Sequence, residues 1–221
     1  METPSESAWD GKSPFIQSHA TAIRIWHWLT FLTIFLLIIT VLLNATVFKT
    51  GHNIAMVQNV LKDNGVTVSE DQAKAVAHEF GDKLWDLHKY LGFGLVFLLL
   101  ARLVIEFTVS TEEKIKSRLT HAIHLAKSNS SDKVILKQYI LVRYSYTLFF
   151  LLILFMGTTG LMMAFGHELG IPRSAHHFIK QFHGYGQYLI YIFTLFHIAG
   201  VVFADLTHSK GIISGMVNGG K

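Results

Sequence analysis

Four apolar stretches divide the chain, and each is long enough to cross a membrane as a helix. Three of them lack Asp, Glu, Lys and Arg altogether, at residues 25–48, 144–166 and 182–204. The fourth has a shorter uncharged centre, at residues 90–101, with charged residues on both sides. A hydrocarbon core of about 30 Å needs roughly 20 helical residues. The pattern therefore predicts an all-α membrane protein, a bundle of four transmembrane helices at about residues 24–48, 84–107, 140–166 and 182–205.

Two local signals refine the helix ends. Arg102 and Glu106 stand four residues apart, so we expect them to form an ion pair on one face of the second transmembrane helix. Ser69 precedes a run that is typical of a surface helix, and Gln72 stands in the capping-box position three residues later. We therefore expect a capped surface helix within the connection 49–83.

The distribution of lysine and arginine predicts how the helices are oriented in the membrane. The connection at residues 49–83 balances its lysines with acidic side chains, whereas the connection at residues 108–138 is strongly basic. Because positive residues stay on the cytoplasmic side, we expect 108–138 to be cytoplasmic, 49–83 to be external and both termini to be cytoplasmic. The first apolar run is too long for a cleavable signal, and residues 1–221 are expected to form a single membrane domain.

The amino-acid composition limits the kinds of metal site that the chain can form. The chain is 51% hydrophobic and 15% charged, with a mean hydropathy of +0.39, whereas soluble domains are about one quarter charged. With no cysteine, it has no disulfide, iron–sulfur ligand or covalent haem attachment of its own. Its net charge of +4 is expected to reflect membrane topology rather than nucleic-acid binding. Thirteen histidines remain, so we expect any metal to be held by imidazole, and no nucleophile–base arrangement indicates a catalytic residue.

Four histidines lie in the apolar helices or at their ends: His27, His88, His183 and His197. An ionisable side chain inside a spanning helix is costly and marks a functional site by default. His183 and His197 are 14 residues apart, which is about 40° short of four full turns and about 21 Å along the helix axis. One face of the fourth helix therefore carries two imidazoles at opposite depths of the membrane.

The predicted topology selects a partner for each imidazole. His27 and His197 lie toward the cytoplasm, whereas His88 and His183 lie toward the outside. Opposed imidazoles on facing helices of a bundle suit axial ligation of haem iron. We therefore expect two stacked, non-covalently bound b haems, one held by His27 with His197 and one by His88 with His183. Neighbouring glycines would make room for a porphyrin, or would only permit close helix packing: Gly92, Gly184, Gly186 and Gly200.

These features resemble those of a known family. The run RIWHW from Arg24 to Trp28 resembles the R-x-W-H-W opening of bacterial four-helix di-haem cytochromes b. These are the cytochrome b561 group and the b-type subunit of nickel–iron hydrogenases. The 14-residue spacing in the fourth helix is similar to theirs, and the tail from Asp205 to Gly219 resembles the hydrogenase-type branch, with its S-x-M-x-x-G ending. The segment 49–83 matches the family less well.

The resemblance implies that the four histidines are axial ligands of two b haems and that quinone chemistry occurs near the cytoplasmic face. Arg24 and Arg102 are candidate partners of the haem propionates on that side, although interfacial anchoring explains them as well. Candidates for a quinone site flank the first and fourth helices: His19, His208 and Lys210.

We therefore expect a multi-pass protein of the bacterial inner membrane that passes electrons between an external, hydrogenase-like partner subunit and the quinone pool. It would be the electron-transfer, quinone-reactive subunit of an oxidoreductase complex, with lipid and quinone as its other partners and no nucleic acid. A stand-alone di-haem oxidoreductase acting on a small oxidant such as superoxide is the alternative within redox chemistry. A haem-free transporter or assembly protein is the alternative outside it.

Overall fold

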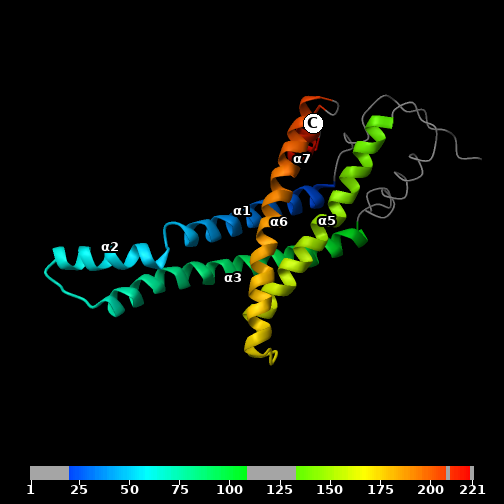
Figure 1. The fold of residues 1–221 in the computed structure, drawn as a ribbon. Coiled ribbons are helices and arrows are strands. Elements are labelled where there is room, and N and C mark those ends of the chain that lie inside the picture. Colours follow the sequence, from blue (N-terminus) through cyan, green and yellow to red (C-terminus); the bar gives the residue numbers. More distant parts are fainter. Residues whose placement is uncertain (1–19, 109–132, 208–209, 220–221) are drawn as a thin grey trace, which may run out of the picture. The chain divides into compact units, whose positions relative to one another are not determined.

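The computed structural model describes residues 20–108, 133–207 and 210–219, and within these ranges the chain forms helices and no strand (Figure 1). The helices are α1 (Thr21–Ala45), α2 (Thr50–Asp63), α3 (Glu70–Thr108), α5 (Lys133–Ala164), α6 (Arg173–Leu206) and α7 (Ile212–Asn218).

Four of these helices are long and apolar enough to cross a membrane: α1, α3, α6 and the part of α5 from Tyr144 to Ala164. Their outer faces carry large apolar side chains, among them Phe97 at 69% exposure and Phe196 at 72%. Water would make such surfaces costly, whereas lipid does not. The prediction of an all-α membrane protein with four spanning helices is confirmed.

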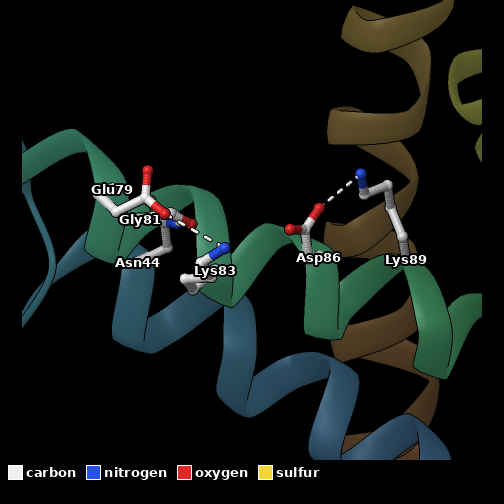
Figure 2. Close-up of polar contacts among 6 residues, drawn as sticks. All are labelled: Asn44, Glu79, Gly81, Lys83, Asp86 and Lys89. Atoms are coloured by element: carbon white, nitrogen blue, oxygen red, sulfur yellow. Dashed lines mark hydrogen bonds and ion pairs between the residues drawn. The ribbon is translucent and has the colours of Figure 1, made fainter.

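The second spanning helix is longer than its apolar pattern indicated. The capping box is confirmed, since the Ser69 backbone N–H donates to Gln72 Oε1 at 2.9 Å and the Gln72 N–H donates to Ser69 Oγ at 3.2 Å. The capped helix then continues without a break into the spanning segment, so α3 begins at Glu70 and not near residue 84. An ion pair of 3.2 Å between Glu79 and Lys83 lies along this junction (Figure 2).

The connection before α3 contains a further helix, α2, which the hydrophobic pattern did not predict. It ends in a Schellman turn: the Gly65 N–H donates to the Lys62 carbonyl at 2.9 Å and the Val66 N–H donates to the Leu61 carbonyl at 2.9 Å. Gly65 has a φ of 78°, in the left-handed region that favours glycine. At the other end, the buried Asn53 side chain donates to the Val47 carbonyl at 3.0 Å.

The helices group into two compact units. The first comprises Met1–Trp26, Arg102–Leu152 and Tyr185–Lys221, and the second comprises His27–Ala101 and Ile153–Gly184. Each long helix therefore contributes one end to each unit.

In the second unit, α1 and α3 lie side by side (Figure 1). Asn44 of α1 donates from Nδ2 to the Gly81 carbonyl of α3 at 3.3 Å (Figure 2). In the same unit, α3 approaches α5 closely, because a Cβ on Gly157 would lie 3.0 Å from Val96 Cγ2. Small residues that allow such close approach are a common basis of helix packing in membranes.

We predict that Gly157→Val destabilises the protein by about 1–3 kcal/mol, because the new side chain has to displace Val96. Gly94→Val is the matched control, since nothing lies within 4 Å of a Cβ at that helical position. Denaturation by SDS in mixed micelles measures both free energies of unfolding. Equal stability of the two variants would contradict the close contact between α3 and α5.

Candidate functional site

The second unit brings together two of the four candidate histidines. His88 of α3 and His183 of α6 have ring centroids 6.5 Å apart, with an angle of 82° between the ring planes. Trp85, one turn before His88, contacts that ring edge-on at 5.4 Å. The backbone of α5 passes close to His183, since a Cβ on Gly160 would lie 3.5 Å from its Cε1.

Each of these two imidazoles contacts a threonine hydroxyl on the neighbouring helix. Thr40 Oγ1 of α1 lies 2.7 Å from His88 Nδ1. Thr159 Oγ1 of α5 lies 2.8 Å from His183 Nδ1. In both rings Nδ1 is therefore engaged with protein, and Nε2 is the nitrogen that remains for another partner.

The geometry of the two imidazoles fits an iron ion bound between them. With metal–imidazole bonds of about 2 Å, the ring centroids would be held roughly 6 Å apart, close to the observed 6.5 Å. Within the described ranges no group of three or more His, Cys, Asp or Glu side chains could hold a metal. A haem needs only two axial ligands from the protein, because the porphyrin supplies the others.

His197, the third candidate, lies in the first unit on α6. Its ring is exposed and stacks on Phe193, with centroids 6.0 Å apart and planes at 8°. Phe193 in turn stacks on Phe149 of α5 at 5.2 Å. The chain of rings continues through Phe150 to Trp26 of α1, with centroid distances of 5.9 Å at both steps. Aromatic packing thus fixes the surroundings of His197.

His27, the fourth candidate, belongs to the second unit, while His197 belongs to the first. The His27 ring is partly buried and meets Trp28 edge-on, with centroids 5.5 Å apart and planes at 86°. The predicted partnership of His27 with His197 therefore stays a prediction.

Arg102 is buried at 5% exposure. Its Nη1 lies 2.9 Å from Glu106 Oε2, so the predicted ion pair is confirmed. The guanidinium also lies over the Trp26 ring, 5.8 Å from the centroid. The positive charge of Arg102 is thus balanced within its own helix and shielded by an aromatic face.

Arg24 contacts the C-terminal tail. Its Nη2 donates to Thr21 Oγ1 at 3.1 Å. Its Nη1 would lie 2.8 Å from a Cβ on Gly219, which has a φ of 83°. The Arg24 Nε is buried and has no hydrogen-bond partner among the described residues. Such a buried donor is costly unless another group satisfies it.

The tail is folded back by one carboxylate. Asp205, near the end of α6, accepts hydrogen bonds at Oδ1 from the N–H groups of Gly211 at 3.0 Å and Ile213 at 3.2 Å. Gly211 has a φ of 93°, which allows the turn into α7. Asp205, the first residue of the tail that resembles the hydrogenase-type branch, therefore shapes the start of the C-terminal helix.

Of the three quinone candidates, Lys210 is exposed in the turn before α7, and His19 and His208 lie outside the described residues. Two histidines near His183 in sequence have other neighbours. His177 Nε2 lies 3.2 Å from Gln181 Nε2, and His176 lies against Gly166, where a Cβ would come within 3.1 Å of its Cδ2.

Sequence reasoning missed Thr40 and Thr159. Both stand in apolar helices, where a threonine usually bonds to its own backbone. Their contacts with the imidazoles join residues 48 and 24 positions apart. No periodicity within one helix reveals such a contact. The sequence offers one signal for them. Each threonine stands at about the same depth in the membrane as a candidate histidine ligand on a neighbouring helix.

Comparison with known proteins gives one match. A family model described as prokaryotic cytochrome b561 matches residues 18–219, nearly the whole chain. No curated protein and no solved structure matches the chain significantly.

We predict that Glu106→Gln destabilises the protein by about 3–5 kcal/mol, because it leaves the buried Arg102 charge without its counter-ion. The double variant Arg102→Met with Glu106→Leu should recover most of that loss, since it removes both charges. Unfolding in mixed micelles measures the three free energies. A double variant as unstable as Glu106→Gln would show that Arg102 has a further essential partner.

Proposed function

The chain belongs to the prokaryotic cytochrome b561 family and is therefore a membrane-bound b-type cytochrome of electron transfer; we propose that it carries electrons across the membrane between an external redox partner and the quinone pool. Two b haems would form the path, one in each half of the membrane. The observation that best supports this proposal is the pair of imidazoles of His88 and His183 in the second unit.

For the external haem we propose His88 and His183 as the axial ligands. Support comes from the ring separation of 6.5 Å. It also comes from the hydrogen-bonding partners at both Nδ1 atoms, which leave Nε2 for the metal. Metal-ligating histidines commonly have their second ring nitrogen engaged in this way.

For the cytoplasmic haem we propose His27 and His197. Topology supports this assignment, because both residues lie toward the cytoplasmic ends of their helices. His197 stands in an otherwise apolar stretch of α6, where an ionisable side chain marks a functional site by default. A haem in this half of the protein would be bound through a nitrogen of the His197 ring.

At the membrane edge we propose Arg24 as the main partner of a haem propionate. Its buried Nε donor has no partner among the described residues, and a carboxylate would satisfy it. Arg102 is the second candidate, but its charge is already balanced by Glu106 at 2.9 Å. We therefore rank Arg102 below Arg24 as a propionate partner.

Quinone would react near the cytoplasmic haem, with His19, His208 and Lys210 as candidate groups. The turn that Asp205 holds in place supports a role for Lys210, since it keeps the backbone beside this exposed residue near the end of α6. On the external side, α2 and the start of α3 carry acidic side chains that suit docking of a soluble redox subunit, hydrogenase-like by resemblance: Asp63, Glu70, Asp71, Glu79 and Asp82.

The residues of the chain perform three tasks in this function. The imidazoles hold and orient the haem irons, which supply reversible one-electron transfer. The apolar helices exclude water and fix the distance between the two sites. Charged groups at the helix ends hold the propionates and set the local potential. The protein would lie in the bacterial inner membrane with both termini in the cytoplasm.

We predict two b haems per chain in the purified wild-type protein, measured by the pyridine haemochrome assay and a reduced-minus-oxidised spectrum. His88→Ala and His183→Ala should each remove the same haem. His27→Ala and His197→Ala should each remove the other. His52→Ala is the control, because that side chain is exposed on α2 and should change neither haem.

Proteoliposomes then identify the electron acceptor. Dithionite outside the vesicles should reduce both haems, and menadione should reoxidise them faster than superoxide does. All four ligand variants should lose this transfer. A colourless protein would refute the proposed function and favour a transporter, and preferential reoxidation by superoxide would favour a stand-alone oxidoreductase.

A further inference from the structure

We propose that Thr40 and Thr159 are positioning residues that fix the tautomer of both ligands of the external haem. Each hydroxyl would hold a proton on Nδ1 of its histidine and so direct the Nε2 lone pair to the iron. The inference rests on the proposed assignment of His88 and His183 as axial ligands. It adds the two residues that decide which nitrogen binds and how basic that nitrogen is.

The single proton of the Thr40 hydroxyl determines the direction of its hydrogen bonds. A hydroxyl has one donor hydrogen and two acceptor lone pairs. Thr40 Oγ1 lies 2.7 Å from the Leu37 carbonyl, to which it donates. Without that proton, two oxygens at 2.7 Å would repel each other. Toward His88 Nδ1, also at 2.7 Å, the hydroxyl can therefore only accept, and Nδ1 must carry the hydrogen.

The Thr159 hydroxyl likewise has one proton, and a backbone carbonyl accepts it. The hydroxyl donates to the Phe155 carbonyl at 2.8 Å, with a weaker contact of 3.2 Å to the Met156 carbonyl. It then accepts a hydrogen bond from His183 Nδ1 at 2.8 Å. Two hydroxyls on two different helices thus impose the same protonation pattern on two facing imidazoles.

This protonation pattern is the one that axial ligation requires. A neutral imidazole protonated at Nδ1 presents an unprotonated Nε2, the form that binds a metal. An acceptor at Nδ1–H also raises the basicity of Nε2. A more basic ligand favours the ferric over the ferrous state, so both threonines should lower the reduction potential of this haem.

Burial strengthens the effect at Thr40. Its side chain is 3% exposed, so water has little access to replace a lost hydroxyl. Removal of that hydroxyl would take away the acceptor that lies 2.7 Å from His88 Nδ1, and the loss of a buried hydrogen-bond partner is costly in an apolar surrounding. Thr159 is half-buried, so the neighbouring side chains can rearrange more easily there, and its replacement should have the smaller effect.

The two threonine–histidine contacts involve all four long helices that contribute to the second unit. Two of them, α3 and α6, supply the imidazoles, and the other two, α1 and α5, supply the hydroxyls. Each bond runs between adjacent helices, so each ring is held by an element other than its own. This arrangement restrains rotation of the rings even before a haem binds.

Two matched controls exist on the same helices. Thr33 of α1 donates to the Leu29 carbonyl at 2.8 Å, and Thr158 of α5 donates to the Leu154 carbonyl at 2.7 Å. Thr158 is exposed and Thr33 is half-buried. Like Thr40 and Thr159, they donate to a carbonyl of the preceding helical turn, so replacing them tests the loss of a helical threonine without the effect on an imidazole.

The experiment measures haem retention and midpoint potentials of Thr40→Val and Thr159→Val, beside Thr33→Val and Thr158→Val, in the full-length holoprotein. The haem lost in His88→Ala should shift to a higher potential in both test variants and should be retained about 10-fold less tightly against apomyoglobin. The other haem should keep its potential, which shows that the variant is folded. Thr40→Ser keeps a hydroxyl and should restore the wild-type potential.

The proposal is wrong if Thr40→Val and Thr159→Val match their two controls in both potential and haem retention. That outcome leaves the proposed function intact, because both haems would still be present. A wild-type protein without haem would instead refute the proposed function. If the valine variants fail to assemble, Thr→Ala variants allow the same comparison, and an unchanged potential in them overturns the proposal equally.

Discussion

The structure depends on the cost of placing imidazole rings inside apolar helices. Each ring has two nitrogens that need partners, and lipid provides none. The second unit meets this constraint with a threonine hydroxyl at Nδ1 of His88 and another at Nδ1 of His183. These hydroxyls do not engage the second nitrogen of each ring, Nε2, which would be available to the proposed haem. The lack of a side chain at Gly160 lets α5 approach the His183 ring closely, since a Cβ there would lie 3.5 Å from its Cε1.

Charged groups obey a related constraint at the helix ends. Arg102 is paired with Glu106 and lies over Trp26, while Lys89 is paired with Asp86 at 2.7 Å (Figure 2). These pairs let charged side chains lie next to apolar stretches without the full cost of an isolated ion. Arg24 differs from them, because its buried Nε has no partner among the described residues. That difference is why we assign the propionate role to it first.

Much of this arrangement is visible in the sequence, and the rest is not, for physical reasons. Apolar runs predicted the four spans, and spacing within one helix predicted the Ser69 capping box and the Arg102–Glu106 pair. The start of α3 at Glu70 was missed, because an amphipathic surface helix can join an apolar one without any breaking residue. Thr40 and Thr159 were missed because contacts between helices leave no periodic signal along either one.

A cryo-EM map of the holoprotein in lipid nanodiscs tests the central claim most directly. The account predicts porphyrin density between His88 and His183, with iron bound to Nε2 of both rings. Each Nδ1 should stay within hydrogen-bonding distance of Thr40 or Thr159, as it is in the present structure. A map with no porphyrin at this pair, or with another residue as an iron ligand, would contradict the account.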